Sequence, residues 1–206
     1  MGEGATPPNP WGDRRRCRVG LLGGSFNPAH EGHRHISLAA LRALALDEVW
    51  WLVSPQNPLK PSAGMAPLAA RIEAAGRVAR HPNLRVSGIE ERLGTRMTAA
   101  TLAVLRRRFP RVRFVWLMGA DNLAQVPRWG HWRRIFRRVP VAVFDRSPYS
   151  AKALAGKAAR VFAAGRVPAA RATAVAGLAP PVWVYLHQRR HSASATAIRT
   201  GEGGAL

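Results

Sequence analysis

Short apolar runs alternate along this chain with longer segments in which apolar residues recur at helical spacing. Runs typical of buried strands cover residues 17–24, 48–53, 84–89, 112–119, 139–144 and 182–187. Helical patterns lie between or after them, near 31–46, 67–80, 98–108, 129–138, 150–164 and from about 194. Parallel strands need crossover connections, which such helices supply. The alternation therefore predicts an α/β fold, an open parallel sheet with helices on both faces.

The length of 206 residues suits a single domain over 17–206, with residues 1–16 as a mobile N-terminal tail. Hydrophobic residues make up 47% of the chain, which excludes global disorder. No apolar stretch reaches the roughly 18 residues of a membrane span. Proline, glycine and charge occupy residues 1–16, where a signal peptide needs an apolar core. We therefore expect a cytoplasmic protein that does not contact membranes.

The chain is strongly basic, with a net charge of +21 and a pI near 12. Of its 32 basic residues only Lys60, Lys152 and Lys157 are lysine, and the arginines are spread through an alanine- and glycine-rich background. GC-rich coding produces such a skew without selection for a partner, so solvated basic faces are the favoured interpretation. An electrostatic funnel for polyanionic substrates is the second interpretation, and dedicated nucleic-acid binding is the least favoured.

Cys17 is the only cysteine, which excludes an internal disulfide and a zinc site with several cysteines. It lies where the first strand is expected to begin. We interpret it as a small buried hydrophobe, with a reactive thiol as the alternative.

Polar segments follow four of the expected strands directly. They cover residues 23–33, 54–60, 119–129 and 187–199. In an open parallel sheet, ligands bind beyond the carboxyl ends of the strands, where the strand order reverses. The four segments are therefore expected to meet in one ligand site.

The segment that follows the first strand has the chemistry of a phosphate-binding loop. Gly23 and Gly24 permit close backbone approach, and His30 and His33 lie three residues apart at an expected helix start, where the helix dipole favours anions. It is neither a Walker A loop nor the dinucleotide G-x-G-x-x-G pattern. A zinc-binding histidine pair and a purely structural role remain as alternatives.

Several motifs resemble those of bacterial nicotinate-nucleotide adenylyltransferases, a family of the nucleotidyltransferase superfamily with the G-x-F-x-P-x-H-x-G-H motif. Gly24 to His33 match that motif. The other matching segments are Trp51 to Lys60, Gly94 to Leu102, Phe114 to Leu123 and Ser194 to Arg199. They occur in family order from about Arg18 to Thr200. The resemblance implies a Rossmann-like nucleotidyltransferase fold and transfer of the adenylyl group of ATP to nicotinate mononucleotide, which gives deamido-NAD and pyrophosphate.

The resemblance assigns two sets of residues. The expected ATP-binding residues are Gly23, Gly24, Ser25, Phe26, His30, His33, Ser194, Thr196 and Arg199, of which His30, His33 and Arg199 are expected to be catalytic. The expected acceptor-binding residues are Asn27, Lys60, Thr98, Asp121 and Trp129. Thr98, as a helix cap, would help to bind the pyridine carboxylate, and Trp129 would stack on the pyridine ring.

Simpler roles remain open for several of these residues. Lys60 could be a solvated loop residue, Asp121 a helix N-cap, and Trp129 a core anchor, the role that we expect for Trp132. Three positions depart from the family pattern: Met97 replaces a frequent tyrosine, Ala100 a polar residue, and Ala195 a serine. These departures change side chains near the expected substrate and ATP contacts and leave the reaction type intact.

The expected cofactor is Mg²⁺, held mainly by phosphates and water and not by a protein metal site. The expected partners are ATP and nicotinate mononucleotide, and a homo-oligomer stays open. The nearest rival acceptors are nicotinamide mononucleotide and phosphopantetheine, and the rival class is a basic nucleic-acid-binding protein. The sequence does not decide between the acid and the amide acceptor.

Overall fold

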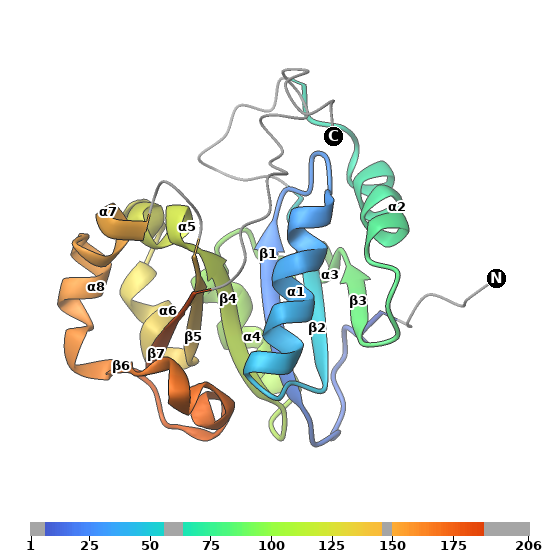
Figure 1. The fold of residues 1–206 in the computed structure, drawn as a ribbon. Helices are drawn as coiled ribbons and strands as arrows, with labels where there is room; N and C mark the ends of the chain where they lie inside the picture. Colours follow the sequence, from blue (N-terminus) through green and yellow to red (C-terminus); the bar gives the residue numbers. More distant parts are fainter. Residues whose placement is uncertain (1–6, 56–63, 146–149, 188–206) are drawn as a thin grey trace.

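The computed structural model describes residues 7–55, 64–145 and 150–187. In them, seven strands form one sheet in the order β3-β2-β1-β4-β5-β7-β6, and every pair of neighbours is parallel (Figure 1). The strands are β1 (Arg18–Gly24), β2 (Glu48–Val53), β3 (Leu84–Ser87), β4 (Arg113–Gly119), β5 (Val141–Phe144), β6 (Arg166–Val167) and β7 (Trp183–Leu186). The predicted open parallel sheet is confirmed.

Helices cover both faces of this sheet. They are α1 (Glu31–Ala43), α2 (Leu68–Val78), α3 (Ile89–Arg92), α4 (Thr98–Arg108), α5 (Ala120–Gln125), α6 (Trp132–Arg138), α7 (Ser150–Leu154) and α8 (Lys157–Val161), with 3-10 turns η1 (Val126–Arg128), η2 (Ala163–Gly165) and η3 (Ala169–Gly177). α1, α2 and η3 share one apolar cluster with the sheet, and α3 to α8 share the other. Figure 1 shows α1 lying across β1 and β2.

The strands read as continuous apolar runs because they are buried on both faces. In β1, Val19 and Leu21 belong to the cluster under α4 to α6, whereas Leu22 belongs to the cluster under α1. Both layers exclude water, so neither face of the central strands is free for a ligand. A binding site must therefore lie at an edge of the sheet.

The strand order reverses at β1. From β1 the chain proceeds to β2 and β3 on one side, and β4 then pairs with β1 on the other side. The carboxyl ends of β1 and β4 thus flank the crevice in which such sheets bind ligands. The segments that start at Gly23 and Gly119 lie at this point, as the sequence predicts.

Several helix and strand boundaries differ from expectation; the helix expected over 129–138, for example, begins only at Trp132. The helix expected over 150–164 is two short helices, because Gly156 is extended (φ −75°, ψ 167°) and caps α8. Residues 163–180, ambiguous in sequence, form η2, β6 and η3. The strand expected over 84–89 ends at Ser87, and α3 follows. The terminal helix expected from about 194 lies outside the described residues.

Residues 7–17 run along the amino-terminal edge of the sheet. Arg108 donates a hydrogen bond to the carbonyl of Pro10, and Arg15 pairs with Asp13 at 2.7 Å. Cys17 is only partly buried, and burial, aided by the nearby Glu48 carboxylate, raises its pKa to about 11. A thiol with so high a pKa is a poor nucleophile at neutral pH, which favours the hydrophobe interpretation.

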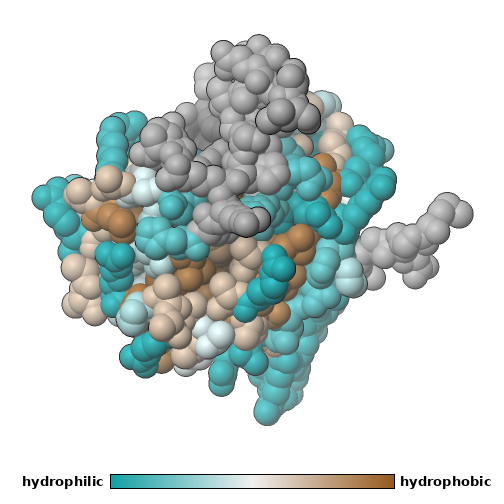
Figure 2. Space-filling view, in the orientation of Figure 1, coloured by the Kyte–Doolittle hydropathy of each residue, from teal (hydrophilic) through white to brown (hydrophobic). Residues whose placement is uncertain are grey.

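The face that α1 covers is chemically mixed. Figure 2 shows scattered hydrophobic patches among hydrophilic residues, which dominate its rim. Among the described residues, the large hydrophobic side chains that are exposed are Trp11, Met97 and Val161. No helix in this part of the chain is long and apolar enough to cross a membrane.

Candidate nucleotide-binding site

The two glycines at the end of β1 have different reasons to be glycine. A Cβ on Gly23 would lie 2.5 Å from the indole of Trp116, so packing against β4 excludes a side chain there. A Cβ on Gly24 would meet only the ring of Phe26, at 3.4 Å. The surroundings of Gly24 within the described chain thus come close to tolerating a side chain. Close approach of a ligand remains the reason we predict for Gly24.

His30 and His33 form the first turn of α1. His30 is the N-cap: its Nδ1 accepts a hydrogen bond from the Gly32 N–H at 3.1 Å, while Nδ1 of His33 accepts one from the His30 N–H at 3.2 Å. A ring nitrogen that accepts carries no proton, so in both neutral rings the proton is on Nε2. The helix start therefore presents two Nε2–H donors together with its dipole, a combination suited to anions.

The ring of His33 packs against Phe26 of the loop after β1 and lies near Trp51 of β2. Phe26 contacts it with ring centroids 4.7 Å apart and stacks on Trp51 of β2 at 5.0 Å. The Ser37 hydroxyl donates to the His33 carbonyl at 2.8 Å and accepts from the Trp51 indole at 2.7 Å. This packing orients the histidine before any ligand arrives, which lowers the entropy cost of binding.

Asn27 holds the chain just before α2. Its amide nitrogen donates to the Gly64 carbonyl at 3.1 Å, and its amide oxygen accepts from the Ala66 N–H at 3.2 Å. Through these contacts Asn27 connects the loop after β1 to the segment before α2, which is a structural role. The predicted role of Asn27 in acceptor binding stays a prediction.

Arg71 of α2 is a residue at this edge that the sequence analysis missed. Its side chain is buried (3% exposed), and its guanidinium donates to four backbone carbonyls. A signal was present, because Arg71 falls on the apolar stripe formed by Leu68, Ile72 and Ala75.

The start of α4 is one residue earlier than the prediction for Thr98 requires. Met97 is the N-cap, with an extended backbone (φ −114°, ψ 131°), and its carbonyl accepts from the Ala100 and Thr101 N–H groups. Thr98 is therefore the first helical residue, and its side chain caps nothing. The prediction that Thr98 caps this helix is wrong. Its predicted contact with the pyridine carboxylate remains a prediction.

Trp129 lies near the start of α4. The Met97 sulfur would be 2.7 Å from a Cβ on Gly130, the residue after Trp129, so the two segments are in contact. Trp129 is half-buried against the core, whereas Trp132 is 7% exposed and belongs to the core as predicted. The tertiary structure thus brings together two segments that the resemblance assigns to the acceptor.

Asp121 follows the carboxyl end of β4. Gly119 is the N-cap of α5 and Asp121 is the second residue of that helix, so the N-cap interpretation of Asp121 is wrong. Gly119 has the extended backbone that is usual for an N-cap residue (φ −78°, ψ 163°). Asp121 stays a predicted acceptor-binding residue.

A buried hydrogen-bonded network lies behind the start of α4. Thr101 donates to the Glu90 carboxylate at 2.8 Å, and the hydroxyls of Thr95 and Thr101 are 2.9 Å apart. Glu90 is 7% exposed, and burial raises the pKa of its carboxyl against the opposing effect of the Thr101 hydrogen bond. The network joins α3 to α4, so it fixes the turn that carries Met97 and Thr98.

The raised pKa of Glu90 predicts a pH-dependent effect of Glu90→Gln. A carboxyl whose pKa is higher in the folded state contributes stability below its unfolded pKa and loses it as pH rises through the folded value. We expect Glu90→Gln, which stays neutral and can still accept from Thr101, to melt above the wild type at pH 8. The advantage should shrink as pH falls toward about 4. Thermal melts at several pH values measure it.

Glu91→Gln is the matched control, because Glu91 is the exposed next residue of α3. The difference in melting temperature between Glu91→Gln and the wild type should not change comparably with pH. If the melting temperature of Glu90→Gln exceeds that of the wild type by the same amount from pH 4 to 8, the role given to the buried charge is contradicted.

Four predicted residues lie outside the described residues: Lys60, Ser194, Thr196 and Arg199. Their roles stay predictions. In the described part of the chain, no group of three or more His, Cys, Asp or Glu side chains is placed to hold a metal ion.

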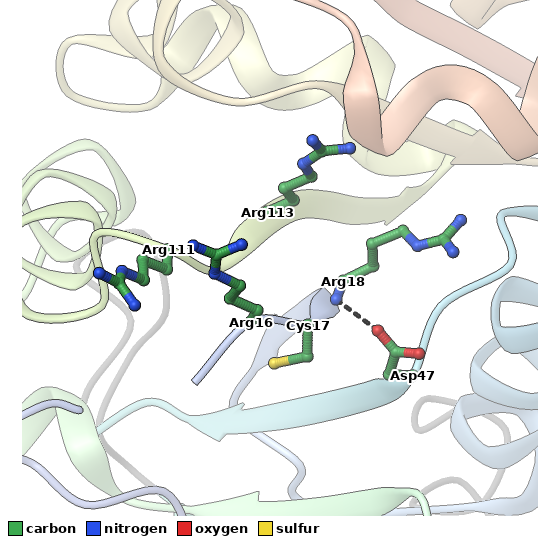
Figure 3. Close-up of a pocket in the computed structure, with 6 residues that line it drawn as sticks. All are labelled: Arg16, Cys17, Arg18, Asp47, Arg111 and Arg113. Carbon is green, nitrogen blue, oxygen red and sulfur yellow. Dashed lines mark hydrogen bonds between the residues drawn. The ribbon is translucent and has the colours of Figure 1, made fainter. Parts of the chain in front are cut away.

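A hollow of about 530 Å³ lies at the opposite edge of the sheet (Figure 3). It is lined by Arg16, Cys17, Arg18, Asp47, Arg111 and Arg113, and the Asp47 carboxylate accepts from the Arg18 N–H at 2.7 Å. Arg18 and Arg113 are register partners at the starts of β1 and β4. The hollow is therefore separate from the site at the carboxyl ends of these strands.

The family model described as Cytidylyltransferase-like matches residues 21–201, a span that contains the whole sheet except the first three residues of β1. A protein of Bradyrhizobium sp. (strain ORS 278), named "Probable nicotinate-nucleotide adenylyltransferase", is 53% identical over 90% of this chain and 97% of its own length. A protein of Cereibacter sphaeroides (strain ATCC 17025) with the same name is 56% identical over 88% of this chain and 96% of its own. The chain belongs to the nicotinate-nucleotide adenylyltransferase family.

Solved structures support the fold. Nicotinic acid mononucleotide adenylyltransferase of Plasmodium falciparum, complexed with APC, matches with a TM-score of 0.66 over 90% of this chain and 83% of that one. The same enzyme complexed with NaAD also matches with a TM-score of 0.66, over 89% and 82%. At 12% identity these likenesses establish the arrangement of the sheet and helices, the Rossmann-like nucleotidyltransferase fold.

Proposed function

We propose that this chain transfers the adenylyl group of ATP to nicotinate mononucleotide in NAD biosynthesis. The products are deamido-NAD and pyrophosphate. The observation that carries the proposal is the pair of Nε2–H donors at the start of α1, which lies where the strand order reverses. The chain that holds this pair is more than 50% identical to proteins named for this activity.

The reaction needs positioning more than acid–base chemistry. The 5′-phosphate of the acceptor attacks the α-phosphorus of ATP, the bond to the β-phosphate oxygen breaks, and pyrophosphate leaves. A phosphate is already a nucleophile, so no general base or covalent intermediate is required. His30 and His33 donate hydrogen bonds to phosphate oxygens as negative charge moves toward the leaving group.

The remaining residues complete this proposal. Ser194, Thr196 and Arg199 hold the triphosphate, and Lys60 approaches the substrate phosphates. Thr98, Asp121 and Trp129 bind the acceptor. Mg²⁺ would be held mainly by the phosphates and water, where it would offset phosphate charge.

A steady-state assay of pyrophosphate release tests the proposal. Nicotinate mononucleotide, nicotinamide mononucleotide and phosphopantetheine are each offered with ATP, with Mg²⁺ and with excess chelator. We expect the highest kcat/KM for nicotinate mononucleotide and no turnover without the metal. A higher kcat/KM for the amide would contradict the acceptor, and turnover in chelator would contradict the cofactor.

The basic composition gives the rival class its test. Salt-dependent binding of duplex DNA or RNA, with no pyrophosphate release from any of the three acceptors, would favour a nucleic-acid-binding protein. The same preparation, analysed by light scattering, tests whether the chain forms a homo-oligomer.

A further inference from the structure

We propose that Arg71 is a positioning residue for adenylyl transfer, which orients the peptide between Ser25 and Phe26 so that its N–H faces the phosphates of ATP. This inference rests on the proposed function. The evidence is the set of groups that its guanidinium binds, the direction that these bonds impose on the peptide, and the absence of a carboxylate partner.

The guanidinium ties together three segments at the carboxyl edge of the sheet. Nη1 donates to the carbonyls of Ser25 at 2.6 Å and Ser54 at 2.8 Å. Nη2 donates to the carbonyl of Pro55 at 3.0 Å, and Nε donates to that of Ala66 at 2.8 Å. One side chain thus links the end of β1, the end of β2 and the approach to α2. The planar fork of arginine can make this set of bonds, whereas lysine cannot.

The bond to Ser25 sets the direction of the next N–H. In a planar trans peptide the C=O and N–H point in opposite directions. Because the Ser25 carbonyl points at Arg71, the Phe26 N–H points away from α2. α2 packs on β2 and β3 (Figure 1), whereas the crevice lies between β1 and β4. A direction away from α2 is therefore one toward the crevice side.

Two further observations agree with a donor turned outward. Among the described residues, the Phe26 N–H has no hydrogen-bond acceptor. Phe26 also has a positive φ of 47°, a conformation that residues other than glycine rarely adopt. The Arg71 bond on one side of this residue and the stacking of its ring on Trp51 hold it in that conformation.

The charge of Arg71 adds to the same effect. Within the described chain it has no ion pair, and burial lowers the pKa of its guanidinium, which nevertheless stays protonated at neutral pH. A buried charge without a counter-ion is costly, and carbonyl dipoles offset only part of that cost. A bound polyphosphate beside the Ser25–Phe26 peptide supplies negative charge on the side where it is lacking.

The test compares Arg71→Met with Arg77→Met, the same change at an exposed arginine of the same helix. We expect Arg71→Met to lower kcat/KM for ATP at least tenfold and to weaken pyrophosphate inhibition similarly. KM for nicotinate mononucleotide should change less than threefold. Arg77→Met should match the wild type. Assays are run well below each variant's melting temperature, measured by circular dichroism.

Arg71→Lys provides a second test in case Arg71→Met does not fold. It retains the charge but loses the fork, so we expect an intermediate loss for ATP, with the acceptor KM again little changed. A folded Arg71→Met variant with the wild-type kcat/KM for ATP overturns the inference. If Arg71→Met does not fold, the same result for Arg71→Lys overturns it. Equal losses for ATP and acceptor, which a general weakening of the fold would cause, also overturn it.

Failure of the proposed function is separable from failure of this inference. A wild-type chain that releases no pyrophosphate with any acceptor contradicts the proposed function alone. Calorimetric titration with ATP then tests Arg71 directly. Weaker ATP binding by Arg71→Met than by Arg77→Met supports the positioning role, and equal binding overturns it.

Discussion

His33→Ala is expected to lower kcat by roughly 10²-fold or more, equivalent to about 2.7 kcal/mol of lost transition-state stabilisation. The Nδ1 of His33 is engaged by the His30 N–H, so Nε2 is the donor that would meet developing charge on the phosphates. Single-turnover measurement of pyrophosphate release reports this step. Removal of the ring also deletes one bond of the capping box, so the melting temperature should fall modestly.

The control for His33→Ala is His35→Ala, a histidine two residues further on in the same helix and hence about 200° around it. Its kcat should stay within a few-fold of the wild type. Unchanged kcat in His33→Ala would remove this residue from the mechanism. An equal loss in both variants would indicate damage to α1 and not loss of a positioned donor.

Phe26→Ala is expected to lower the free energy of unfolding by about 3–5 kcal/mol, the usual cost of truncating a buried phenylalanine. The ring is 2% exposed and lies between Trp51 and His33. Its loss removes the support of the His33 ring, so kcat should fall as well. Chemical denaturation measures the first effect, and turnover of the folded variant measures the second.

Phe109→Ala separates these two effects. Phe109 is equally buried but belongs to the cluster on the opposite face of the sheet, where it packs against Trp50 and Phe114. We expect a comparable loss of stability with kcat close to that of the wild type. Similar kcat losses in both variants would show that Phe26 affects turnover only through stability.

Much of the fold could be predicted because the residue patterns that form its strands and helices are local. The strands are apolar on both faces and the helices carry apolar stripes, so each pattern is contained within its own segment. Errors arose where one backbone conformation decides a boundary. The extended backbone at Gly156 divides the helix expected over 150–164, and that at Met97 moves the cap of α4 by one residue.

The location of the candidate site could be predicted from the sequence, but only some of its residues could. The segment from Gly23 to His33 is recognisable because its chemistry is contiguous in sequence. Arg71 and Glu90 were missed because their partners are carbonyls and hydroxyls supplied by other segments. A charged residue on an apolar stripe is a warning sign, but the groups that satisfy it are known only after folding.

The amino-acid sequence alone predicts the parallel α/β architecture, the anion-binding segment after the first strand and the family resemblance, because periodicity and motif spacing are local properties. Tertiary packing explains why individual residues are required. Gly23 must be glycine because Trp116 of β4 lies against it, and the His33 ring packs against Phe26, which stacks on Trp51 of β2. Such contacts join residues distant in sequence, and only the packing of the completed sheet brings them together.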